Sequence, residues 1–201
     1  NKSSPTQIGA FTSWKFVGAN GYNAYALTLN NLLYTWGTNS SYQLGDGSST
    51  YRSFPMQITT LGDDVSTRSY ATATGQTQKS WTLLSMGFAN GAGIQSDGTL
   101  WTWGDNTAGQ LGIGTSPSVM PWTNYPIKIG TSSWTSVSVG NSYMLAIRND
   151  STLFSWGLNN AGQLGVFSGT NTNFSSPVLV GVSSDATNYN SYAFSGNEQL
   201  L

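Results

Sequence analysis

Short runs of alternating apolar and polar residues, separated by Gly, Asn and Asp, recur along the chain. WTSVSV at 134–139 alternates with a period of two, and YMLAI (143–147) and TLFSW (152–156) follow closely. Such a period over four to six residues predicts short β-strands with one buried face. NN at 30–31 and DG at 97–98 separate consecutive runs, where residues that tolerate positive φ form hairpin turns. The pattern therefore predicts an all-β chain built from hairpins.

A ten-residue motif, WGxNxx[GY]QLG, occurs three times and begins at Trp36, Trp103 and Trp156. Another tryptophan lies 22 residues before each of these three positions. Self-similarity at a fixed spacing is the signature of a repeat architecture. The motif positions that we assign to a shared structural framework are Trp36, Gly37, Gln43, Gly45, Trp103, Gly104, Gln110, Gly112, Trp156, Gly157, Gln163 and Gly165.

A proline followed three positions later by an aliphatic residue marks each unit, with unit spacings of 50, 71 and 51 residues. The predicted units are 5–54, 55–125 with an inserted loop at 59–80, 126–176, and an incomplete unit at 177–201. Each complete unit offers four short strand candidates. Four antiparallel strands in about 50 residues describe one blade of a β-propeller. The predicted fold is therefore a partial β-propeller of about three and a half four-stranded blades.

The repeated residues of the motif favour a structural role. Tryptophans placed identically in every unit are expected to pack between neighbouring blades rather than to stack on sugars, because large aromatics bury much apolar area. The repeated glutamines are expected to satisfy backbone groups, and the glycines to form turns, because no phosphate-binding lysine or helix accompanies them. The motif is therefore predicted to be scaffold rather than an active site.

The motif and its flanks resemble the repeats of the regulator of chromosome condensation family. DGTLWTWGDNTAGQLG at 97–112 and TLFSWGLNNAGQLG at 152–165 carry this resemblance. It implies a β-propeller, usually of seven blades, that mainly binds other macromolecules. Founding members bind chromatin and stimulate nucleotide exchange on a small GTPase. One departure is that Asn23, Asn90 and Tyr143 stand where family members often have histidine.

The length of the chain corresponds to about half of such a ring. Seven units of this size need roughly 357 residues, so the resemblance implies further blades outside this segment. These blades would belong either to the same chain or to separate chains.

Composition excludes several classes of function. Charged residues make up 7% of the chain, with seven basic and eight acidic side chains, so no strong field draws in nucleic acid. The absence of histidine and cysteine removes Ser/His/Asp triads, Cys/His pairs and common zinc sites. No apolar run reaches the roughly 18 residues needed to cross a bilayer. We therefore expect no catalysis, no cofactor, no metal, no nucleic acid and no membrane insertion.

Residues that differ between units are the best candidates for partner binding, because they are free of the shared packing role. The inserted loop contributes Asp63, Asp64, Arg68 and Tyr70, and the loop at 116–125 contributes Met120 and Trp122. Exposed aromatics of this kind often anchor protein contacts. The alternative is that both segments are surface loops packed by their own side chains.

Two functional hypotheses follow from these observations. Low charge, absent cysteine and Ser/Thr/Asn-rich strands favour a structural or attachment component of an exterior assembly, such as a phage virion or a secreted particle. Its partners would be other protein subunits or a surface glycan, and its location extracellular or on the virion surface. The alternative is a soluble propeller that binds one globular partner, as an enzyme inhibitor or an exchange factor for a small GTPase does.

Overall fold

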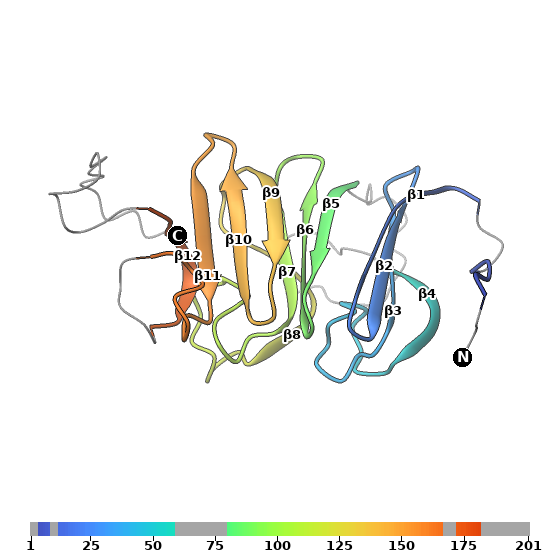
Figure 1. Cartoon of the computed structure of the whole chain (residues 1–201), viewed down its shortest axis with the longest axis horizontal. Coiled ribbons are helices and arrows are strands. Elements are labelled where there is room, and N and C mark those ends of the chain that lie inside the picture. Colours follow the sequence, from blue (N-terminus) through green and yellow to red (C-terminus); the bar gives the residue numbers. More distant parts are fainter. Residues whose placement is uncertain (1–3, 9–11, 59–79, 167–171, 182–201) are drawn as a thin grey trace, which may run out of the picture.

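The computed structural model describes residues 4–8, 12–58, 80–166 and 172–181, which form three four-stranded antiparallel sheets (Figure 1). Strands neighbouring in the chain are neighbours in each sheet. The predicted all-β propeller-blade architecture is therefore confirmed. The strands are β1 (Trp14–Asn20), β2 (Asn23–Thr28), β3 (Leu33–Gly37), β4 (Arg52–Ile58), β5 (Trp81–Met86), β6 (Asn90–Gln95), β7 (Leu100–Asp105), β8 (Trp122–Lys128), β9 (Trp134–Val139), β10 (Tyr143–Arg148), β11 (Leu153–Gly157) and β12 (Phe174–Leu179).

Each sheet is one blade: β1–β4 form the first, β5–β8 the second and β9–β12 the third. The blades group the strands differently from the sequence units, which begin at a proline. The proline-containing strand is the last strand of each blade, where β4 pairs with β3 and β8 with β7. Proline has no N–H to donate, so it fits an edge strand that needs bonds on one side only. The first blade therefore spans Trp14 to Ile58.

The glycine of the Trp-Gly pair is required by close backbone packing. Gly104 has φ of 96°, and a Cβ there would collide with the carbonyl oxygen of Ala89. Gly37 and Gly157 also have positive φ and the same type of collision, with Tyr22 and Ser142. Only glycine accepts both constraints. Glycine therefore allows the backbone to turn out of the third strand of each blade and into the QLG segment.

The apolar cores lie between blades. One cluster joins Leu27 and Leu33 of the first blade to Trp81, Leu84 and Trp103 of the second. An equivalent cluster joins the second blade to the third. The first strands approach the neighbouring blade, with β5 contacting both β1 and β9. The blades therefore follow one another as sectors of a ring.

The two ends of the blades carry different connections. We name the end with the β1–β2, β5–β6 and β9–β10 turns and the three WGxNxx[GY]QLG segments the loop end. The opposite end, with the β2–β3, β6–β7 and β10–β11 turns, is the hairpin end. In Figure 1 the hairpin end of the third blade is uppermost and its loop end is below. Residues at the same end of different blades face the same side of the arc.

Candidate protein-contact site

The repeated tryptophans join each blade to the preceding one. Trp103 and Trp156 are completely buried. The Nε1 of Trp103 donates to the carbonyl of Gln43, and that of Trp156 donates to the carbonyl of Gln110, both at 2.9 Å. A buried indole N–H needs such an acceptor. Each bond therefore fixes one blade on the QLG segment of its neighbour.

Side chains of the motif hold its own backbone. The Gln43 Oε1 accepts from the Ser41 amide at 2.8 Å, and the Asn39 Oδ1 accepts from the Leu44 amide at 3.0 Å. The same bonds recur at Gln110 and Asn106, and at Gln163 and Asn159. Repeated side-chain to backbone hydrogen bonds of this kind make the loop rigid. The motif is the support on which the loop end is built.

Trp36 differs from its two counterparts because it is only half-buried. No blade precedes it among the described residues, and its Nε1 has no acceptor there. At the other end of the arc, Gln163 is half-buried, whereas Gln43 and Gln110 are buried. The two outer faces of the arc therefore present motif residues that the inner junctions cover.

Trp122 and Met120 lie at the loop end of the second blade. Trp122 stacks on Tyr42 of the first blade, with ring centroids 4.1 Å apart and planes at 20°. The rest of the Trp122 side chain is exposed. Met120 is half-buried, and its carbonyl accepts from the Asn106 Nδ2 at 2.7 Å. Trp122 is thus held in place by one face while the remainder stays accessible.

Tyr42 explains why one motif has Tyr where the others have Gly. Its φ is 61°, the left-handed conformation adopted by Gly109 and Gly162 in the other blades. Such a conformation costs a residue with a Cβ about 1–2 kcal/mol. An aromatic pair contributes about 0.5–1.5 kcal/mol of stabilisation. The stacking on Trp122 therefore offsets much of the backbone strain.

Three further exposed aromatics lie at the loop end. Tyr22 in the β1–β2 turn is 75% exposed, and Phe88 in the β5–β6 turn is 52% exposed. Their rings meet edge to face at 6.5 Å. Tyr51, just before β4, is exposed at the same end. Our sequence analysis missed all three. For Tyr22 and Phe88 the signal was available, because the third blade has Asn141 and Ser142 in the corresponding turn.

The residues that flank the inserted loop lie at the opposite end of the blades from this group. Asp63, Asp64, Arg68 and Tyr70 lie outside the described residues. The flanking Ile58 pairs with Leu33 at the hairpin end. The flanking Trp81 pairs with Gln95, also at the hairpin end. The two predicted contact segments are therefore attached to the blades at opposite ends.

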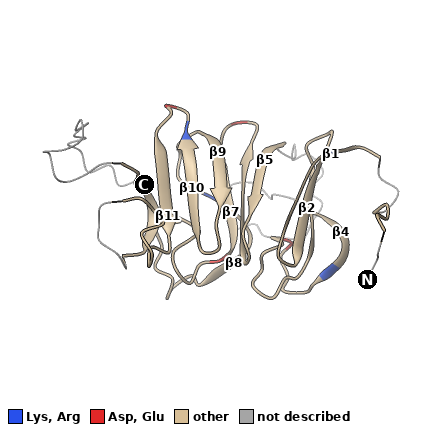
Figure 2. Cartoon of the chain, viewed as in Figure 1, with Lys and Arg blue, Asp and Glu red and all other residues tan. Residues whose placement is uncertain are grey.

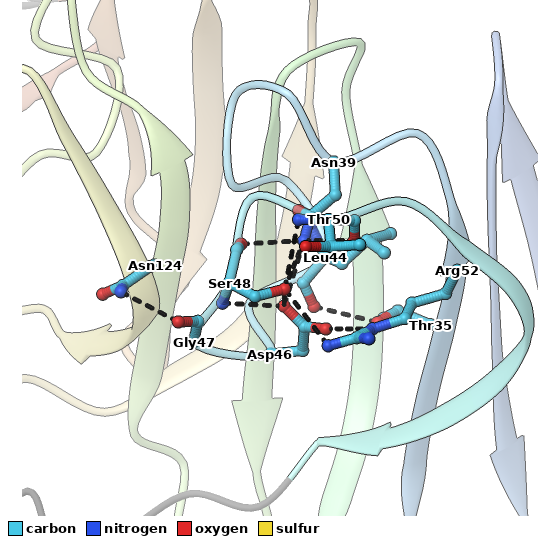
Figure 3. Close-up of polar contacts among 9 residues, drawn as sticks. All are labelled: Thr35, Asn39, Leu44, Asp46, Gly47, Ser48, Thr50, Arg52 and Asn124. Carbon is cyan, nitrogen blue, oxygen red and sulfur yellow. Dashed lines mark hydrogen bonds and ion pairs between the residues drawn. The ribbon is translucent and has the colours of Figure 1, made fainter.

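A partly buried ion pair between Asp46 and Arg52 fixes the loop before β4 (Figure 3). The Arg52 Nε donates to the Asp46 Oδ2 at 2.6 Å, and Asp46 also accepts from the Ser48 amide and hydroxyl and from the Asn39 Nδ2. The Gly47 amide donates to the Asn124 carbonyl at 2.8 Å, which ties the loop to β8. The chain around Tyr51 is thus anchored on both blades.

Two titratable groups have shifted pKa values. Hydrogen bonds from Arg148 and Thr152 hold the pKa of Asp150 well below its usual range, at the hairpin end. Burial raises the pKa of Tyr25, which lies in the junction between the first two blades. Both shifts keep the groups in their usual forms near neutral pH.

The described residues give no support for metal chemistry or membrane insertion. Within them, no three His, Cys, Asp or Glu side chains are grouped so that they could hold a metal ion. They also contain no helix long and apolar enough to span a membrane. Their charged side chains are scattered rather than clustered (Figure 2). The exposed aromatics are thus the most distinctive feature of the loop end.

Comparison with known proteins agrees with the repeat pattern. Residues 30–75, 97–147 and 150–196 match the regulator of chromosome condensation (RCC1) repeat, and a second form of this repeat matches 134–163. The chain belongs to this family. The ultraviolet-B receptor UVR8 of Arabidopsis thaliana is 29% identical over 88% of the chain, and the X-linked retinitis pigmentosa GTPase regulator homolog of Caenorhabditis elegans is 36% identical over 45% of it. The chain spans 36% and 6% of these relatives.

Solved structures show the same fold. Prp20p of Saccharomyces cerevisiae superposes with a TM-score of 0.69, covering 89% of the chain and 40% of Prp20p at 18% identity. Human WBSCR16 gives a TM-score of 0.68, covering 88% of the chain and 40% of WBSCR16 at 18% identity. The chain thus corresponds to less than half of these propellers of the family.

Proposed function

We propose that the chain is a non-catalytic part of a β-propeller that binds another protein through the loop end of its blades. The observation that supports this proposal is the group of exposed aromatics at that end: Tyr22, Tyr51, Phe88 and Trp122. Aromatics are enriched at the centres of protein interfaces, where single anchors contribute about 2 kcal/mol or more to binding. The same side chains would otherwise be an unusual cost to solubility.

The rigidity of this end supports the proposal. Aromatic side chains lose little conformational entropy on binding, because they have only two rotatable bonds. Trp122 is already stacked on Tyr42, and Phe88 already contacts Tyr22. The Asp46–Arg52 pair holds the loop beside Tyr51. Such preorganised anchors lower the cost of association.

A protein partner also agrees with what is known of structural relatives. The Prp20p structure is described with its binding to Gsp1p and histones, and yeast RCC1 (Prp20) has been crystallised bound to Kap60. At 18% identity these partners are not carried over to this chain. They support only the class of partner, a protein.

Two finer roles extend the proposal. In the first, the loop end attaches the propeller to protein subunits or glycans of an exterior assembly, on a virion or a secreted particle. The low charge of the chain and its lack of cysteine support this role. In the second, the loop end grips one globular partner, as an inhibitor or exchange factor does. The size of the captured complex distinguishes them.

Site-specific photo-crosslinking in an extract of the source organism tests the proposed surface. A photoreactive phenylalanine analogue replaces Phe88 at the loop end, and the matched control replaces Leu29, an exposed residue of the β2–β3 turn at the hairpin end. We expect a discrete crosslinked protein from position 88 and none from position 29. The substitution Tyr22→Ser should weaken the crosslink at position 88.

The outcome also separates the finer roles. A crosslinked species that sediments as a large particle supports the assembly role, and a one-to-one complex supports the single-partner role. Equal crosslinking at positions 29 and 88, or crosslinking at 29 alone, would contradict binding at the loop end.

A further inference from the structure

We infer that the loop end binds an uncharged, proline-containing segment of its partner, in the polyproline II conformation, at the junction between the first and second blades. This inference rests on the proposed function, because it names the chemistry of the partner segment that contacts the same surface. Four aromatic side chains form the site, and we name them the aromatic ledge: Tyr22, Phe88, Tyr42 and Trp122.

Both aromatic pairs of the ledge span this junction. Tyr22 of the first blade meets Phe88 of the second edge to face, with ring centroids 6.5 Å apart. Tyr42 of the first blade stacks on Trp122 of the second, with centroids 4.1 Å apart. The first pair lies in the turns that follow β1 and β5, and the second pair lies at the start of β8. The ledge therefore extends from the first strands of the blades to the last strand of the second blade.

The junction between the second and third blades has no such ledge. The positions that correspond to Tyr22, Phe88, Tyr42 and Trp122, in that order, are occupied there by Ala89, Asn141, Gly109 and Asn173. Both junctions join blades of the same four-stranded topology. The fold therefore does not require aromatic residues at these positions. Exposed aromatics that the fold does not require are typical of a binding surface.

The backbone at the ledge is engaged in internal hydrogen bonds. The amides of Ser41 and Leu44, on either side of Tyr42, donate to side chains of the motif. The Gly47 amide donates to the Asn124 carbonyl at 2.8 Å. A partner strand added to a sheet edge would need free backbone groups there. A polyproline II segment has a solvated backbone and is recognised by aromatic side chains, so it fits the ledge better than an added strand.

The charges near the ledge are held by internal partners. Arg52 is bound to Asp46 at 2.6 Å. The Asp105 carboxylate accepts hydrogen bonds from the Thr107 hydroxyl at 2.8 Å and from the Gln110 amide at 2.5 Å. The ledge thus presents aromatic faces rather than charges to a partner. We expect the partner segment to be uncharged, because a charge that loses water without gaining a partner is unfavourable.

Isothermal titration calorimetry with a capped oligoproline peptide tests the inference. This probe carries no charge and forms a polyproline II helix in solution. We expect it to bind at least about tenfold more tightly than a capped Gly-Ser peptide of the same length, because its conformation is preformed.

Variants of the ledge locate the binding site. Phe88→Ala and Trp122→Ala should each weaken oligoproline binding about tenfold, as the loss of an aromatic anchor does. The matched control is Asn141→Ala, because Asn141 is the exposed counterpart of Phe88 in the third blade. It should bind the peptide like the parent chain. Circular dichroism checks that all three variants are folded.

The salt dependence of binding provides a second readout. The affinity should change less than about twofold between about 0.05 M and about 0.5 M salt, because no ion pairs form across the contact. A tenfold fall in affinity with salt, equal binding of the Gly-Ser peptide, or unchanged binding by Phe88→Ala and Trp122→Ala would overturn the inference. If position 88 still captures a protein by photo-crosslinking in that case, only the chemistry of the segment is wrong. If position 88 captures no protein, the proposed function fails as well.

Discussion

Residues that are identical in sequence have different environments along this arc. Trp36, Trp103 and Trp156 open the same motif, but among the described residues only the last two have a preceding blade that buries them. Their indole N–H groups bind the carbonyls of Gln43 and Gln110. The contribution of each tryptophan to stability therefore depends on its neighbour rather than on its motif.

This difference predicts unequal effects of the same substitution. Trp103→Phe should lower the free energy of unfolding by about 3 kcal/mol, because it leaves a buried carbonyl unsatisfied and opens a cavity. Trp36→Phe should lower it by less than about 1 kcal/mol, since a partly exposed site without a partner loses little. Urea denaturation at low protein concentration measures both. Equal losses of unfolding free energy in the two variants would show that the hydrogen bond of Trp103 does not contribute to stability.

At the scale of elements, the loop between β3 and β4 is stabilised by a device that does not repeat. Asp46 follows the QLG segment of the first blade, where the other two blades have Ile113 and Val166. Its carboxylate accepts hydrogen bonds from Arg52, Ser48 and Asn39. Hydrogen bonds to a charged and largely buried acceptor are stronger than those to neutral ones. The first blade therefore keeps this loop ordered by electrostatics rather than by apolar packing.

Comparison of two Arg–Asp pairs tests this interpretation. The Asp46–Arg52 and Asp150–Arg148 pairs are both 2.6 Å long, but the acidic side chains are 4% and 45% exposed respectively. Asp46→Asn should lower the free energy of unfolding by about 2 kcal/mol, because Arg52 loses its partner in a largely buried site. Asp150→Asn should have a much smaller effect, because water screens an exposed pair. Thermal denaturation of both variants measures the difference, and similar losses would contradict the role given to burial.

At the scale of the whole molecule, stability depends on how many neighbours a blade has. In repeat architectures each unit gains most of its stability from adjoining units. All six residues of β6 in the middle blade are buried. The strand β10, second in the third blade as β6 is in the second, has exposed and half-buried residues. The middle blade is thus the most protected described part of the arc.

Hydrogen exchange should show that the middle blade is better protected than the third. The amides of β6 are expected to exchange more slowly than those of β10, because opening β6 disrupts both of the described blade junctions and opening β10 disrupts one of them. Mass spectrometry of exchanged peptides measures the rates at low protein concentration. Because both strands are second in their blades, position within the blade is the same. Faster exchange in β6 would mean that the blades unfold independently of their neighbours.

The candidate contact site was only partly predictable from sequence. Met120 and Trp122 were proposed because they lack counterparts in the other units, and Trp122 is exposed at the loop end. Tyr22 and Phe88 were missed because they are 66 residues apart in the chain. Only the packing of β1 beside β5 brings their turns together. A contact between two blades has no local signal.

The sequence by itself determined the strands, the turns and the repeat, because alternation and turn residues act within a few positions of the chain. It did not determine where one blade ends: the strand with Pro55 pairs backward with β3, which is decided by hydrogen bonds between strands. Nor did it determine that Trp103 is buried while Trp36 is not. Burial depends on which surface covers a side chain, and only the tertiary structure brings that surface into place.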